Sequence, residues 1–112
     1  MGCTHASIEY GDGWVVVALT TARLIEPPVV EDLRTALLAA LDAHPEARFR
    51  LDFTGVEVVG SLMLALLAGL HQQLDPALRP VVLSGLGPEL RRLLTMTRLD
   101  TLFVVEPPPA GD

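Results

Sequence analysis

Short apolar runs alternate with longer stretches of helical periodicity along nearly the whole chain. Runs rich in β-branched residues are typical of strands, and apolar residues spaced three or four apart are typical of amphipathic helices. The predicted strands are residues 8–10, 14–19, 49–53, 80–83 and 102–105, and the predicted helices are residues 29–43, 61–74 and 88–96. Strands that alternate with helices favour right-handed crossovers. We therefore predict an α/β fold in which helices pack against one mixed β-sheet, in the order β-β-α-β-α-β-α-β.

Glycine and proline residues mark the boundaries of these segments. Gly11-Asp12-Gly13 lies between two apolar runs and predicts a tight hairpin turn. Pro28 suits the first turn of a helix, and Thr54-Gly55 interrupts the apolar residues before a second short run at 56–59. The opening hairpin and the start of the first helix are therefore specified by local residue type.

The composition suits one compact domain. The chain has 112 residues, of which 50% are hydrophobic, and domains of about this length are common. Such a hydrophobic content excludes an intrinsically disordered chain. We expect a single domain over residues 1–106, followed by a flexible proline-rich tail over residues 107–112.

Charge and hydropathy narrow the range of partners. The net charge is −6, and the eight basic residues are all arginine and are scattered along the chain, which argues against nucleic acid as a partner. The most apolar run, residues 61–70, is shorter than the roughly 20 residues needed to cross a bilayer, so we expect no direct membrane insertion. The first residues lack the pattern of a secretory signal, so a cytoplasmic location is expected.

The sequence gives no sign of catalysis or of a bound metal. It contains no glycine-rich phosphate loop and no recognisable nucleophile motif. The single cysteine, Cys3, and the histidines His5, His44 and His71 show no metal-ligand spacing. We therefore expect a protein that is not an enzyme and that binds no metal or cofactor.

Ser61 is the one reactive side chain in a suggestive place. It follows Gly60 after an apolar run and stands where the second helix should begin, near unpaired backbone N–H groups and the positive end of the helix dipole. A phosphate added there would be tolerated and would bring nearly two negative charges. The alternative from chemistry alone is that Ser61 is an ordinary helix N-cap.

Three other arrangements have structural explanations. Glu31 and Asp32 both suit the first turn of a helix, where carboxylates complement the helix dipole. Arg91-Arg92 could bind an anion, but solvated positions on the outer face of a short helix explain them better. His71 ends an apolar helix, where an imidazole is electrostatically favoured.

Several segments together resemble the STAS domain of anti-sigma-factor antagonists. These segments are the strand and turn of residues 50–56 (RLDFTGV), the loop of residues 56–61 (VEVVGS), the apolar helix after it, and residues 89–103 (ELRRLLTMTRLDTLF). The similarity extends over about residues 6–106 and includes the predicted order of strands and helices.

The resemblance implies a site as well as a fold. In the family, the first serine of an Asp-Ser-Ser-Gly-Leu motif accepts phosphate from a kinase that is also the anti-sigma factor, and this serine falls on Ser61. The implied partner-binding residues are Thr20, Thr21, Arg23, Gly60, Leu62, Met63, Ser84 and Gly85. The chain departs from the family motif at Gly60, where the family has aspartate, at Leu62, where it has the second serine, and at Met63, where it has glycine. A second acidic residue of the family would fall on Leu24. The family's final helix also has no counterpart before the prolines of residues 107–109.

Two functions from this reading stay open, and a third ranks below them. The first is a regulatory module that binds a serine-kinase-type anti-sigma factor and is switched by phosphate at Ser61. The second is a constitutive STAS subunit of a larger assembly, either a stress-signalling complex or a lipid-transport ABC system, without a phosphate switch. An enzyme ranks last because no base, metal set or phosphate loop accompanies the serine. A homodimer is possible in either of the first two cases.

Overall fold

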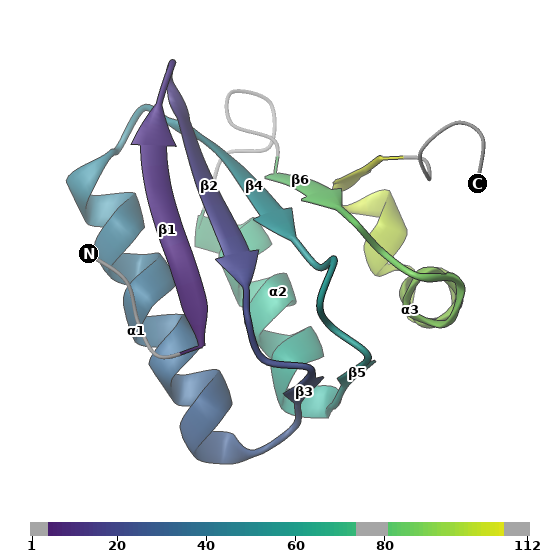
Figure 1. Ribbon diagram of the computed structural model, residues 1–112. Helices are drawn as coiled ribbons and strands as arrows, with labels where there is room; N and C mark the ends of the chain where they lie inside the picture. Colours follow the sequence, from purple (N-terminus) through teal and green to yellow (C-terminus); the bar gives the residue numbers. More distant parts are fainter. Residues whose placement is uncertain (1–4, 74–80, 107–112) are drawn as a thin grey trace.

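The computed structural model of the chain describes residues 5–73 and 81–106 (Figure 1). The elements, in order, are β1 Ala6–Gly11, β2 Trp14–Leu19, β3 Arg23–Leu24, α1 Pro27–Ala43, β4 Arg48–Asp52, β5 Val58–Val59, α2 Ser61–Gln73, β6 Val81–Ser84, α3 Pro88–Met96, the 3-10 turn η1 Leu99–Thr101 and β7 Val104–Val105. The predicted order of main strands and helices is confirmed, with β3, β5 and η1 added. Three predictions lie outside the described residues: the end of the second helix at Leu74, the start of a strand at Pro80, and the flexible tail of residues 107–112.

The main sheet has five strands in the order β1-β2-β4-β6-β7. The hairpin strands β1 and β2 are antiparallel, whereas β2, β4, β6 and β7 are parallel to one another. The hairpin turn places Asp12 at φ 54° and Gly13 at φ 82°. Two successive residues with positive φ are typical of a type I′ turn, which matches the twist of the flanking strands. The predicted mixed sheet is therefore confirmed.

The last strand is shorter than predicted. The chain leaves α3 through Arg98 at φ 63° and then forms η1, so only Val104–Val105 pairs with the sheet. Residue 102 still belongs to the turn that closes this 3-10 segment, since the Leu102 N–H donates to the Leu99 carbonyl at 3.0 Å. An apolar run without polar residues does not reveal where a turn ends and a strand begins.

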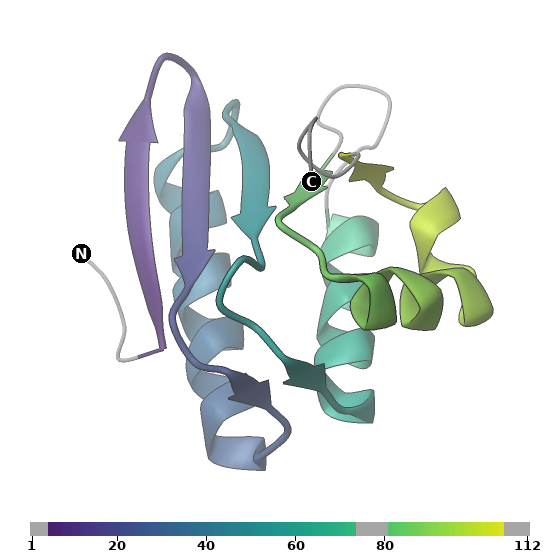
Figure 2. The ribbon, with the colours of Figure 1, turned by 45° about the vertical axis from the view of Figure 1, so that its right-hand side comes forward.

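Helices α1 and α2 lie side by side against one face of the sheet (Figures 1 and 2). Alternate strand residues point towards them and are fully buried, among them Val17, Phe49, Leu51 and Leu83. Within residues 5–73 and 81–106 the buried residues are all hydrophobic. No helix in this part of the chain is long and apolar enough to span a membrane.

The opposite face of the sheet carries an aromatic and charged row. The guanidinium groups of Arg48 and Arg50 lie 5.6 and 5.3 Å from the centre of the Trp14 ring. Arg50 Nη1 also lies 2.5 Å from Glu106 Oε2. The Glu106 carbonyl accepts a hydrogen bond from Arg91 Nη1 at 2.8 Å. The prediction that Arg91 is a solvated residue is therefore wrong. Its side chain connects α3 to the residue that follows β7.

Candidate partner-binding site

A short second sheet brings two of the predicted site segments together. Strands β3 and β5 pair in parallel, with Arg23 opposite Val58 and Leu24 opposite Val59. The Gly60 N–H donates to the Leu24 carbonyl at 3.0 Å, which extends this contact to the start of α2. The segment after β2 and the segment before Ser61, which α1 and β4 separate in sequence, thus lie side by side (Figure 2).

Ser61 is the first residue of α2 and its side chain is exposed. The Leu64 N–H donates to the Gly60 carbonyl at 3.2 Å, which makes Gly60 the N-cap. The prediction that Ser61 itself is the N-cap is therefore wrong by one residue. The first turn of α2 contains no acidic residue, so the free N–H groups at this end face no carboxylate from their own turn.

The two apolar residues after Ser61 have different environments. Leu62 is 46% exposed, whereas Met63 is 0% exposed and belongs to the core. The prediction that the Met63 side chain contacts a partner is therefore wrong, because this side chain is buried in the core. Leu62 alone of the two presents an apolar side chain beside Ser61.

The segment between β2 and α1 presents Thr20 and Arg23 to solvent, while Thr21 is half-buried. Thr21 Oγ1 lies 2.7 Å from His5 Nδ1. His5 Nε2 in turn lies 3.7 Å from Asp32 Oδ2 on α1. His5 therefore holds the Thr21 side chain, a role that the sequence analysis missed. The predicted hairpin could have indicated this contact. Pairing of β1 with β2 brings His5, just before β1, close to Thr21, just after β2.

Ser84 and Gly85 lie at the end of β6 against the turn that leaves β4. The Ser84 carbonyl accepts a hydrogen bond from the Phe53 N–H at 2.8 Å. A Cβ added at Gly85 would lie 2.4 Å from Thr54 Oγ1 and 2.6 Å from Asp52 Oδ1. Asp52 Oδ1 accepts hydrogen bonds from both the N–H and the hydroxyl of Thr54. The contacts of Ser84 and Gly85 thus define a second cluster with Asp52 and Thr54, two residues that the sequence analysis did not select.

Leu24 occupies a position that cannot carry a surface acid. Its side chain is 0% exposed and belongs to the core. The next residue, Ile25, is half-buried and lies 3.5 Å from where a Cβ on Gly60 would stand. The site around Ser61 is therefore lined by apolar residues and backbone groups.

The described residues offer no metal site. In the ranges 5–73 and 81–106, no group of three or more His, Cys, Asp or Glu side chains could hold a metal ion. The side chains of Ser61, Leu62 and Arg23 are all exposed.

The chain thus combines three parallel strands that follow a hairpin with a serine at the start of its second crossover helix. The chain belongs to the STAS domain family, since the family model described as "Mlab, STAS domain" matches residues 14–106. No curated protein is significantly similar to the chain in sequence.

Solved structures share this fold. An anti-sigma factor antagonist from Mycobacterium paratuberculosis is 23% identical, with 96% of this chain and 91% of that chain covered and a TM-score of 0.78. A STAS domain protein from Planctomyces limnophilus, also described as an anti-sigma-factor antagonist, is 21% identical over 90% of this chain and 87% of its own, with a TM-score of 0.77. The phosphorylated form of the Bacillus cell fate determinant SpoIIAA is 17% identical over 92% of both chains, with a TM-score of 0.69.

Proposed function

We propose that this STAS domain is a non-enzymatic regulatory module that binds a serine-kinase-type anti-sigma factor through the surface around Ser61. The observation that carries the proposal is the exposure of Ser61 and Leu62 at the start of α2, beside the β3–β5 pair. Exposed Leu62 offers an apolar anchor next to the Ser61 hydroxyl, and exposed Arg23 on β3 adds a charged group, a combination of apolar and polar contacts that protein interfaces commonly have.

Phosphate at Ser61 would switch this binding off. The free N–H groups of the first turn and the positive end of the α2 dipole would stabilise the phosphate in the unbound module. In the complex, the same group would bring nearly two negative charges to a contact built around exposed Leu62. Desolvating those charges would weaken docking. The SpoIIAA relative, which has a structure in a phosphorylated form, supports this part of the proposal by analogy.

A constitutive STAS subunit of a larger assembly is the second candidate. It is favoured by the absence of an acidic residue from the first turn of α2 and by Leu62 in place of a second hydroxyl. Such a subunit would dock through the same surface without modification. Phosphorylation of Ser61 distinguishes the two candidates.

The purified protein, incubated with ATP and the serine kinase encoded nearest to its gene, is expected to gain the mass of one phosphoryl group. Peptide mass spectrometry should locate the group on Ser61, because this hydroxyl is exposed at a helix start. The Ser61→Ala variant is the matched control and should gain no mass. No gain with the unmodified chain, or a gain at another hydroxyl, would contradict the switch and favour the constitutive subunit.

Gly60→Asp should restore one acidic residue of the family pattern without harming the fold. Gly60 is the N-cap of α2, where aspartate is a preferred residue, and the new Cβ would meet Ile25 at an ordinary contact distance of 3.5 Å. The free energy of unfolding, measured by urea titration, is expected to stay equal or to rise by a few tenths of a kcal/mol. A loss of about 1 kcal/mol or more would show that Gly60 is not a free N-cap position.

A further inference from the structure

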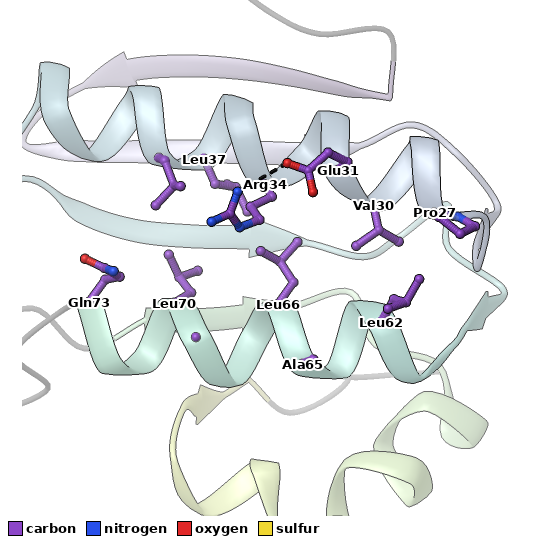
Figure 3. A pocket seen from close by; sticks show the side chains of 12 residues that line it. Pro27, Val30, Glu31, Arg34, Leu37, Leu62, Ala65, Leu66, Leu70 and Gln73 are labelled. Carbon is purple, nitrogen blue, oxygen red and sulfur yellow. Dashed lines mark hydrogen bonds and ion pairs between the residues drawn. The ribbon is translucent and has the colours of Figure 1, made fainter.

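Helices α1 and α2 enclose an apolar groove on the side away from the sheet (Figure 3). Its volume is about 400 Å³. Its walls are mainly aliphatic, with Val30 and Leu37 from α1 and Leu62, Leu66 and Leu70 from α2. Glu31 and Arg34 stand at the rim, joined to each other at 3.2 Å. The groove begins at Leu62, immediately beside the candidate site.

The exposed face of α2 carries no acidic or basic residue other than a histidine at its end. From Ser61 to Gln73 the sequence contains no Asp, Glu, Lys or Arg. Its exposed residues include Leu62, Ala65 and Gly69, all of which line the groove. A surface helix of a monomeric protein normally has charged residues on its outer face. This pattern is typical of a helix that another helix covers.

Gly69 strengthens this interpretation. A glycine in the middle of a helix lowers helix stability relative to alanine. A Cβ added at Gly69 would meet nothing within 4 Å, so no contact inside the described chain requires a glycine here. A bare backbone at this point lets an external element approach α2 closely.

The charges around the groove indicate what kind of element fits. The ion pair of Glu31 with Arg34 is neutral, and Asp42, one turn beyond the groove residue Leu38, leaves the far end of α1 negative. Helices α1 and α2 each connect two parallel strands, so they run in the same direction. Their carboxyl ends add partial negative charge at the end of the groove near Asp42. An occupant with basic residues at that end is favoured.

A second copy of the chain fits less well. Each copy has a net charge of −6, so two copies repel each other. The most basic described helix, α3, already uses its apolar residues Leu90 and Leu94 in the core of its own chain.

We infer that the groove between α1 and α2 docks an amphipathic helix of another protein, antiparallel to α1 and α2, with basic residues near its amino-terminal end. Its aliphatic stripe fills the groove, and its positive end lies over Asp42 and the carboxyl ends of α1 and α2. The inference goes beyond the proposed function, because this docking needs neither a kinase nor phosphate at Ser61.

Fluorescence anisotropy with a synthetic helical peptide tests the inference. The probe is a labelled peptide about as long as α2, with leucines spaced three and four apart and lysines in its first turn. Saturable binding to the full chain is expected, and a peptide with glutamates in place of the lysines should bind about tenfold more weakly. Absence of saturable binding, or equal affinity for the two peptides, would overturn the inference.

Two matched variants locate the binding. Gly69→Arg fills the groove and should weaken binding of the lysine peptide by about tenfold or more. Gln72→Arg adds the same charge to an exposed position of α2 that does not line the groove, and it should leave affinity nearly unchanged. Circular dichroism should show that both variants stay folded. Equal losses in the two variants would overturn the inference, as would a dimer of the chain that Gly69→Arg dissociates. Neither variant changes Ser61, so failure of this test leaves the phosphorylation test unaffected.

Discussion

Replacing Leu24 by aspartate is expected to lower the free energy of unfolding by about 5 kcal/mol. The Leu24 side chain is 0% exposed in the core. Truncating a buried leucine alone costs about 2–5 kcal/mol, and a carboxylate left there would be desolvated without a partner. Because domains are stable by only about 5–15 kcal/mol, the variant should be largely unfolded. Urea titration followed by circular dichroism measures the change.

The matched control for this variant is Leu24→Met, which keeps the volume and the apolar character of the side chain. It should cost less than about 1.5 kcal/mol. If the aspartate variant were as stable as the methionine variant, residue 24 would have to be accessible to solvent, and the burial of the Leu24 side chain would be wrong. The two positions where the family has acidic residues, 60 and 24, are therefore expected to differ in their tolerance of aspartate. Gly60 can accept aspartate, whereas Leu24 cannot.

Gly85→Ala is expected to lower the free energy of unfolding by about 3 kcal/mol. Gly85 has φ +71°, and an added Cβ would lie 2.4 Å from Thr54 Oγ1 and 2.7 Å from the Thr54 nitrogen. The positive φ strains the backbone of any residue that carries a side chain. The close Cβ contacts force apart the turns that follow β4 and β6. Thermal or urea unfolding measures the loss.

Gly11→Ala is the control for Gly85→Ala. A Cβ at Gly11 would meet nothing within 4 Å, and the residue lies at the exposed end of β1. This variant should keep the stability of the unmodified chain within about 0.5 kcal/mol. If the two alanine variants unfolded alike, the close approach of Gly85 to Asp52 and Thr54 would not be a feature of the folded protein.

Leu62 connects the two proposed surfaces. It stands next to Ser61 at the start of α2 and also forms one end of the groove between α1 and α2. A partner that covered both surfaces would bury Leu62 at the centre of its contact, where apolar side chains contribute most to binding. Gly69→Arg shows whether a given partner uses the groove, whereas Ser61→Ala shows only whether Ser61 accepts phosphate.

Local residue patterns were sufficient to predict much of the fold. The helix over residues 88–96 was predicted with the bounds that α3 has, because Pro88 starts it and Leu90 and Leu94 recur at helical spacing. The opening hairpin was predicted because Gly11-Asp12-Gly13 lies between two apolar runs, and the structure places Asp12 and Gly13 at the two positive φ angles of its turn. Both features depend on residues close together in sequence.

The candidate site was harder to predict because it depends on contacts between distant segments. Strands β3 and β5 have two residues each, too few for any periodicity, and they exist only as a pair. The run from Ser61 to Leu70 is apolar on every side of the helix, so its pattern does not distinguish exposed Leu62 from buried Met63. Asp52 and Thr54 became visible as site neighbours only through the approach of Gly85.

The amino-acid order alone dictates an α/β chain with a hairpin start, three helices and a serine at the mouth of the second helix, because turns and helix periodicity act over a few residues. Tertiary packing decides which side chains reach the surface. It buries Leu24 and Met63, makes Gly60 rather than Ser61 the N-cap, and places α1 beside α2 to form the groove. These outcomes follow from burial shared between elements far apart in sequence, which no local pattern records.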